Sequence, residues 1–264
     1  MLSYQHLYHA GNLADVHKHA LLAWMLDYLT AKPKPLSYIE THAGRGLYDL
    51  SAPEARKTGE AAQGIGRAAD WFDADHPYAQ ALAATRATHG PAAYPGSPLI
   101  AATLLRPDDR LHLAEAHPAE HAALARALPW ERQIRHEDGF AMARALVPPT
   151  PRRGLMLIDP SYEVQADYDR LPDFVAAMAR KWNVGVIVLW YPILRDARHA
   201  GMLSALEAAH PDALRHEVGF PPARAGHRMT GSGLFVLNPP WGLAEEAARL
   251  SARFAALEGS AKPG

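Results

Sequence analysis

The sequence lacks cysteine, carries almost no net charge and has no long apolar run. Without cysteine the chain cannot form disulfides, use a thiolate nucleophile or bind zinc through sulfur. Apolar runs such as Leu155–Ile158 and Val184–Trp190 are much shorter than the roughly 20 residues that cross a bilayer. The first residues also lack the basic segment and apolar run of a signal peptide. These absences predict a cytoplasmic protein that does not enter a membrane.

The charge balance argues against strong non-specific binding of polyanions. Lys and Arg number 27 against 28 Asp and Glu, which gives a net charge of −1, whereas non-specific nucleic-acid affinity comes from clustered basic side chains. A local basic patch remains open. Two basic segments could supply it, one with Arg45, Arg56, Lys57 and Arg67, the other with Arg224, His227 and Arg228. Solvated helix faces and a loop are the alternative interpretation of these charges.

Histidine is abundant, with 15 residues in the 264 of the chain. No pair has the context of a metal site such as H-E-x-x-H. We therefore expect surface and packing histidines and no metal, with a zinc centre as the less favoured alternative.

Short apolar strands alternate with helical stretches from Leu36 onward, which is the pattern of a parallel sheet covered by helices on both faces. Seven strands are expected: Leu36–Glu40, Leu111–Glu115, Gln133–Glu137, Gly154–Asp159, Val184–Trp190, Leu214–Phe220 and Gly233–Asn238. With 48% hydrophobic residues the chain can bury a large core. The pattern predicts one α/β domain over residues 1–264.

Two helical regions flank the first strand. Ahead of it, apolar residues recur at helical spacing from Leu13 to Tyr28, with Asn12 as the expected N-cap. After it, about seventy residues precede the second strand, far more than a βα crossover needs. The excess, approximately residues 51–94, is rich in alanine and helical in pattern. We expect a helical insertion beside the ligand cleft.

Acidic residues end several of the expected strands. Because ligands of doubly wound sheets bind outside the carboxyl ends of the strands, Glu40, Glu115, Asp138 and Asp159 are predicted to point into one cleft. Glu40 opens the string ETHAGRG, whose glycines allow a tight turn against a ligand. A carboxylate at Glu115 can accept ribose hydroxyls, and one at Asp138 an adenine amino group. A turn acid and a helix cap are the alternatives, but the acids together favour a ligand that contains a nucleoside.

The fourth strand ends in Asp159-Pro160-Ser161-Tyr162, which is close to the D/N-P-P-Y/F signature of amino methyltransferases. The lone pair of an exocyclic amine is delocalised into the ring, so the amine is a poor nucleophile. A carboxylate and the carbonyl of a proline-fixed turn can accept its N–H groups and aim the lone pair at a methyl donor. Tyr162 can stack on the base. An ordinary Asx-Pro turn with a buried Tyr162 is the alternative.

Eight strings spread along the chain resemble the RlmJ family. They are MLSYQHLYHAGNLADVHKH, ETHAGRG, YPGSPLI, EAHP, EDGF, IDPSY, LWYP and MTGSGLFVLNPPW. The first is the most specific, and the resemblance is weakest at about residues 51–90. It implies a class I methyltransferase, with a Rossmann-like, mainly parallel seven-stranded sheet whose last strand is antiparallel. The implied reaction is methyl transfer from S-adenosylmethionine to the exocyclic N6 amine of an adenine in 23S ribosomal RNA.

The resemblance also implies roles for individual residues. The cofactor contacts would be His19, His42, Ser97, Glu115, Asp138 and Gly139, with Lys18 and Asp159 beside them. Asp159 would be the catalytic acceptor, and Tyr4 would lie at the RNA together with Tyr162. Packing histidines, an N-cap at Ser97 and a terminal tyrosine at Tyr4 are the alternatives. The partner would be 23S ribosomal RNA, naked or in an early assembly state, and the protein a monomer.

The chain departs from the family pattern at Ser161, where a second proline is usual. Serine restores a backbone N–H and frees φ, which affects rate and base geometry more than reaction type. Three rival functions stay open: DNA adenine or protein glutamine methylation, a non-catalytic RNA-binding module, and a nicotinamide-dependent dehydrogenase. The N-terminal string argues against DNA or protein methylation. The retained Asp159 and Tyr162 argue against a non-catalytic module. The incomplete glycine fingerprint argues against a dehydrogenase.

Overall fold

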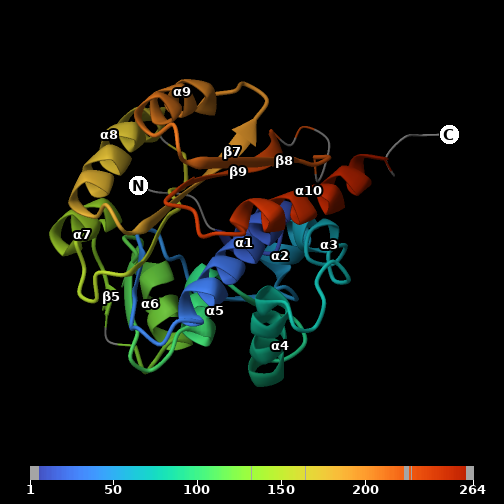
Figure 1. Ribbon diagram of the computed structural model, residues 1–264. Coiled ribbons are helices and arrows are strands. Elements are labelled where there is room, and N and C mark those ends of the chain that lie inside the picture. The colour runs from blue at the N-terminus through green and yellow to red at the C-terminus, as the bar shows by residue number, and fades with distance from the viewer. Residues whose placement is uncertain (1–5, 132, 164, 223–225, 227, 260–264) are drawn as a thin grey trace.

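The computed structural model describes residues 6–131, 133–163, 165–222, 226 and 228–259 (Figure 1). Within them, seven strands form one sheet in the order β5-β4-β1-β6-β7-β9-β8. The strands are β1 (Ser37–Glu40), β4 (Arg110–Ala114), β5 (Ile134–Arg135), β6 (Gly154–Ile158), β7 (Val186–Leu194), β8 (Leu214–Gly219) and β9 (Met229–Leu237). The expected α/β class and its seven strands are confirmed.

The sheet is parallel except for one strand. β9 lies between β7 and β8 and runs antiparallel to both, as the resemblance implied. β7 and β9 are longer than expected, because they pair with each other from Ile187 opposite Leu237 to Leu194 opposite Met229. Pro192 stands inside this extension. β6 pairs with β7 only as far as Leu189, so Pro192 lies where one edge of β7 has no neighbouring strand, a position that tolerates proline.

Helices cover both faces of the sheet (Figure 1). Side chains of β6 alternate between them: Leu155 and Leu157 pack into one core, Met156 and Ile158 into the other. The first core includes α1 (Leu13–Thr30), α4 (Pro77–His89), α5 (Ser97–Leu104), α6 (Pro118–Ala127) and α10 (Leu243–Gly259). The second includes α7 (Gly139–Leu146), α8 (Gln165–Lys181) and α9 (His199–Ala209). Among the described helices, none has the length and apolar character needed to cross a bilayer.

Helix α1 begins where the sequence predicted. The Asn12 side chain accepts a hydrogen bond from the Asp15 N–H at 2.9 Å and so caps the helix. Unlike an amphipathic surface helix, α1 is buried on nearly all sides, because it contacts α4, α5, α10 and β9. Its polar residues His17, Lys18 and His19 are therefore inside the protein.

The long segment between β1 and β4 is largely helical. It contains β2 (Leu47–Asp49), α2 (Pro53–Thr58), α3 (Glu60–Gln63), α4 and β3 (Ala93–Pro95) before α5 begins. β2 and β3 form an antiparallel ribbon that the sequence did not indicate, because each strand has only three residues. Buried Glu60 bonds to His9 and Asn12 ahead of α1, so the insertion packs against the N-terminal segment, which includes the short η1 (His6–Tyr8).

Candidate active site

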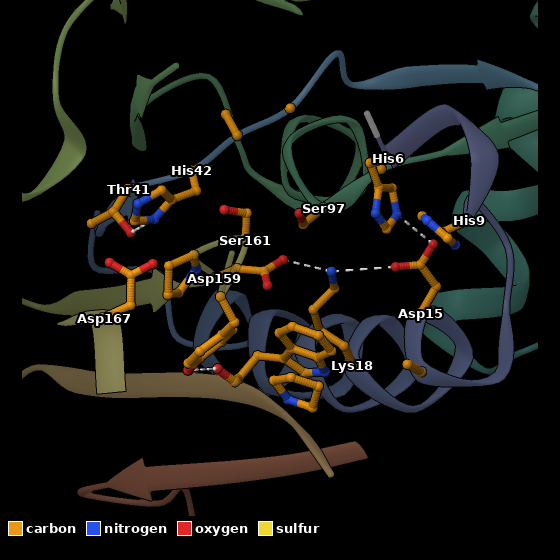
Figure 2. A pocket seen from close by; sticks show the side chains of 18 of the residues that line it. His6, His9, Asp15, Lys18, Thr41, His42, Ser97, Asp159, Ser161 and Asp167 are labelled. Carbon is orange, nitrogen blue, oxygen red and sulfur yellow. Dashed lines mark hydrogen bonds and ion pairs between the residues drawn. The ribbon is translucent and has the colours of Figure 1, made fainter. Parts of the chain in front are cut away.

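A pocket of about 900 Å³ opens at the carboxyl ends of β1, β4 and β6 (Figure 2). Nine of the ten site residues expected from the sequence line it: Lys18, His19, His42, Ser97, Glu115, Asp138, Gly139, Asp159 and Tyr162. The tenth, Tyr4, lies outside the described residues. The chain thus brings together at one place residues that stand up to 144 positions apart in the sequence, from Lys18 to Tyr162.

Glu115 is held by the turn that follows β1. Its two carboxylate oxygens accept the backbone N–H groups of Gly44, at 2.8 Å, and His117, at 2.7 Å. Gly44 adopts φ +62°, and a Cβ there would lie 2.8 Å from the Tyr48 hydroxyl, so the turn needs glycine. Partial burial raises the pKa of Glu115. Each oxygen keeps a lone pair that can accept a ligand hydroxyl.

Asp138 and Gly139 begin α7 at the pocket wall. Asp138 is the N-cap, since its Oδ1 accepts the Ala141 N–H at 2.8 Å, so the helix-cap interpretation is correct; the side chain is exposed and lines the pocket as well. A Cβ on Gly139 would lie 1.7 Å from the Thr41 carbonyl oxygen. Only glycine lets α7 begin so close to the turn after β1.

The expectation for Glu40 and the alternative interpretation of Ser97 are both wrong. Glu40 does not point into the cleft: it is fully buried and accepts hydrogen bonds from the Tyr38 hydroxyl at 2.8 Å and the Ser97 hydroxyl at 2.5 Å. Ser97 is not an N-cap either, because Gly96 holds that position and Ser97 is the first residue of α5. Without a charged partner within hydrogen-bonding distance, burial raises the pKa of Glu40 to about 8.

Protein stability should therefore depend on pH through Glu40. The folded protein keeps this carboxyl protonated up to about pH 8, whereas an unfolded chain releases the proton near the ordinary value of 4.5. Because the folded state binds more protons between these values, its stability falls as pH rises through this range. We expect Glu40→Gln and the wild type to melt alike at pH 5 and the wild type to melt lower at pH 8. A constant difference in melting temperature would contradict the assignment.

Asp159 forms an ion pair that the sequence did not indicate. Lys18 Nζ lies 2.6 Å from Asp159 Oδ2 and 3.3 Å from Asp15 Oδ1 (Figure 2). Burial alone would lower the pKa of Lys18, but the two carboxylates outweigh it and hold the pKa above its ordinary range. Asp159 is 14% exposed, so its carboxylate faces the pocket with a fixed cation behind it. The resemblance implied that Lys18 lies beside the cofactor contacts. In the structure its nearest charged partner is Asp159, the expected catalytic acceptor.

His19 and His42 are neutral in the folded protein. His19 Nδ1 lies 2.9 Å from the Tyr94 hydroxyl, and burial lowers the pKa of His19 to about 3. His42 Nδ1 lies 2.7 Å from the Thr41 hydroxyl, and burial lowers its pKa to about 4. Neutral imidazoles can exchange hydrogen bonds with a ligand without adding charge.

Tyr162 is a packing residue to a greater extent than the sequence suggested. Its ring centroid lies 4.7 Å from that of Tyr168 and 5.9 Å from that of Trp190, and 7% of the residue is exposed. The hydroxyl donates to the Trp190 carbonyl at 2.6 Å. Stacking of a base needs a free ring face, so the structure favours the packing alternative over the stacking role. The Trp190 indole also lines the pocket, and Lys18 Nζ lies 5.3 Å from the centre of its ring.

Tyr162 variants should accordingly lose stability. Tyr162→Ala is expected to lower the free energy of unfolding by roughly 3–5 kcal/mol, as for other large buried aromatic side chains. Tyr162→Phe should lose about 1 kcal/mol with the hydrogen bond. Denaturant unfolding measures both losses. If Tyr162→Ala had the same unfolding midpoint as the wild type, the packing role would be wrong and the ring would be assigned to base stacking.

The residues of the two basic segments differ in their position relative to the pocket. Arg45 forms a two-point contact with Glu120, at 2.5 and 2.9 Å, and does not line the pocket. Arg56, Lys57 and Arg67 are exposed, and their contact with RNA stays a prediction. Arg224 and His227 lie outside the described residues. Arg228 lines the pocket.

Known proteins are similar to this chain over most of its length. A family model described as ribosomal RNA large subunit methyltransferase D, RlmJ, matches residues 33–258. Ribosomal RNA large subunit methyltransferase J of Escherichia coli is 39% identical over 93% of this chain and 90% of its own. The protein of the same name from Haemophilus influenzae is 38% identical over 92% and 89%. A Legionella pneumophila protein of known crystal structure is 33% identical, with a TM-score of 0.84 over 94% of both chains. This chain belongs to the RlmJ family of ribosomal RNA large subunit methyltransferases.

Proposed function

We propose that the protein transfers the methyl group of S-adenosylmethionine to the exocyclic N6 amine of an adenine in 23S ribosomal RNA. The observation that carries this proposal is the Asp159 carboxylate, which faces a deep pocket from the turn after β6 and is paired with buried Lys18 at 2.6 Å. Family membership supports the RNA of the large subunit as substrate.

The residues of the pocket fit a nucleoside-containing methyl donor. Glu115 presents two fixed carboxylate oxygens suited to ribose hydroxyls, and Asp138 keeps an exposed carboxylate beside the close approach at Gly139. The volume of about 900 Å³ is near the upper end of small-molecule sites, enough for two ligands side by side. S-adenosylmethionine would supply an electrophilic methyl group bound to a positively charged sulfur.

The protein contributes positioning and a proton acceptor. Asp159 and the Pro160 carbonyl would accept the two N–H groups of the adenine amine, which holds the nitrogen with its lone pair toward the methyl group. The amine becomes acidic only after the new N–C bond forms. Asp159 therefore serves as an orienting acceptor first and takes the proton late. The Lys18 ammonium, 2.6 Å from Asp159 Oδ2, holds this carboxylate in place.

The form of the substrate follows from access to the amine. A stacked and paired adenine cannot present its N6 atom in a pocket, so the base must be unpaired or extruded. Free 23S RNA or an early assembly particle allows this, and we expect one of them to be the substrate. We expect the protein to be a monomer in the cytoplasm.

The test is methylation of a 23S RNA transcript by the purified protein with methyl-labelled S-adenosylmethionine. Mass-spectrometric mapping of RNA fragments should find N6-methyladenosine at one position per RNA, and the same position should lack the group in RNA from cells without the gene. Methyl transfer to another base would overturn the choice of adenine. A protein that fails to bind S-adenosylmethionine in calorimetry would overturn the methyltransferase assignment.

A further inference from the structure

Exposed arginines lie in the wall of the active-site pocket and directly beside it. Arg170 and Arg228 line the pocket itself. Arg195 lies beside Arg228, since its backbone N–H donates to the Arg228 carbonyl at 3.2 Å, and Arg198 follows three residues later in the same loop. We call Arg170, Arg195, Arg198 and Arg228 the arginine lip. In a chain with a net charge of −1, this is a local excess of positive charge.

The arginine lip has more guanidinium groups than carboxylates paired with them. Asp196 bonds to both Arg198, at 2.7 Å, and Arg228, at 2.5 Å, so one carboxylate serves two guanidinium groups. Asp167 pairs with Arg170 at 2.7 Å. Arg195 has no ion pair among the described residues. Among the described residues, three of the four guanidinium groups thus form ion pairs with two carboxylates, Asp167 and Asp196.

The ion pair of Arg228 can be exchanged at little cost. The side chains of Arg228 and Asp196 are 62% and 36% exposed, and exposed ion pairs contribute roughly 0–1 kcal/mol. Arg170 is 51% exposed, although its partner Asp167 is buried. Arg170 is also oriented, because its guanidinium lies 4.1 Å from the centre of the Phe140 ring. The fork of an arginine matches the oxygens of a phosphate and can bind two of them at once.

We propose that the arginine lip binds the phosphates on either side of the target adenine. This inference rests on the proposed function. It goes further by stating which part of the RNA the arginine lip contacts. Once the base enters the pocket, its sugar-phosphate backbone must stay at the rim, because a phosphate loses too much hydration energy in a buried site. The lip therefore contacts the RNA next to the modified nucleotide, whatever its sequence.

The test compares Arg170→Gln and Arg228→Gln with Arg249→Gln. Arg249 is a matched control: it is exposed, pairs with Glu246 three residues earlier, as Arg170 pairs with Asp167, and does not line the active-site pocket. Binding of a 23S RNA transcript is measured by filter retention over a series of KCl concentrations. Cofactor affinity is measured by calorimetry, because it should not change.

Each lip variant is expected to bind RNA about 5- to 20-fold more weakly, as for one lost charged contact. Its slope of log K against log salt should become less steep by roughly 0.7–0.9, as for the loss of one phosphate contact. Slopes unchanged from wild type in both lip variants, an equal loss in Arg249→Gln, or no RNA binding by the wild type would each overturn the proposal. Altered slopes without any methylation by the wild type would retain the lip and reject the proposed function.

Discussion

Asp159→Ala is expected to lower the rate of methyl transfer by about 10²- to 10⁴-fold, the usual scale for a positioned proton acceptor. The variant removes the carboxylate that faces the pocket but leaves Lys18 beside Asp15, at 3.3 Å, so a charged partner for the buried ammonium remains and the fold should persist. Single-turnover kinetics with labelled cofactor measure the effect, and calorimetry should show cofactor affinity within a few-fold of wild type.

Asp159→Asn separates the two roles given to this residue. The amide keeps an oxygen that can accept an N–H of the target amine, but it cannot take up a proton at neutral pH. We expect its rate to lie between those of the wild type and Asp159→Ala. If Asp159→Ala turned over at a near-normal rate, another group would have to orient the amine.

Gly139→Ala is expected to weaken cofactor binding by roughly 10- to 100-fold, which corresponds to the 1–3 kcal/mol that overpacking usually costs. The new methyl group would lie 1.7 Å from the Thr41 carbonyl oxygen and 2.5 Å from its carbon. These are backbone atoms, so relief requires that the turn carrying His42 and Gly44 move away from α7. Calorimetric titration with S-adenosylhomocysteine measures the loss.

Gly201→Ala provides the control for this substitution. Gly201 is also helical, in α9, and a Cβ there would meet no atom within 4 Å. Because alanine favours helix over glycine by about 1 kcal/mol, this variant should be slightly more stable and bind cofactor normally. Normal cofactor affinity in Gly139→Ala would mean that the turn after β1 is not part of the cofactor site.

The sequence predicted the features that depend on local pattern. Strand positions follow from apolar runs bounded by acids and glycines, and parallel pairing then brings the residues after β1, β4, β5 and β6 to one edge. This is why Glu115, Asp138 and Asp159 were correctly assigned to one pocket. The Asn12 cap was predictable for the same reason, since a cap depends on only a few neighbouring residues.

Features that depend on distant partners could not be predicted. Glu40 also ends a strand, but its side chain contacts Tyr38 and Ser97 in the interior; nothing in the residues around it distinguishes that orientation from one into the cleft. The burial of Tyr162 depends on Trp190 in β7 and Tyr168 in α8. The Lys18–Asp159 pair joins residues 141 positions apart. Hydrophobic periodicity predicts local secondary structure and cannot predict a contact between residues so far apart in the sequence.

The contact between the insertion and the N-terminal segment limits how the protein can be shortened by engineering. Ile65 donates its N–H to the Gly11 carbonyl at 2.8 Å, and a Cβ on Gly64 would lie 2.0 Å from that same oxygen. Glu60 bonds to His9 and Asn12, which precede and follow Gly11 in the sequence. A chimera in which a short turn replaced residues 50–92 would remove the surface on which the start of α1 rests, and Lys18 stands less than two helical turns further along. Such a minimal version would retain the whole central sheet and still lose the alignment of its acceptor carboxylate.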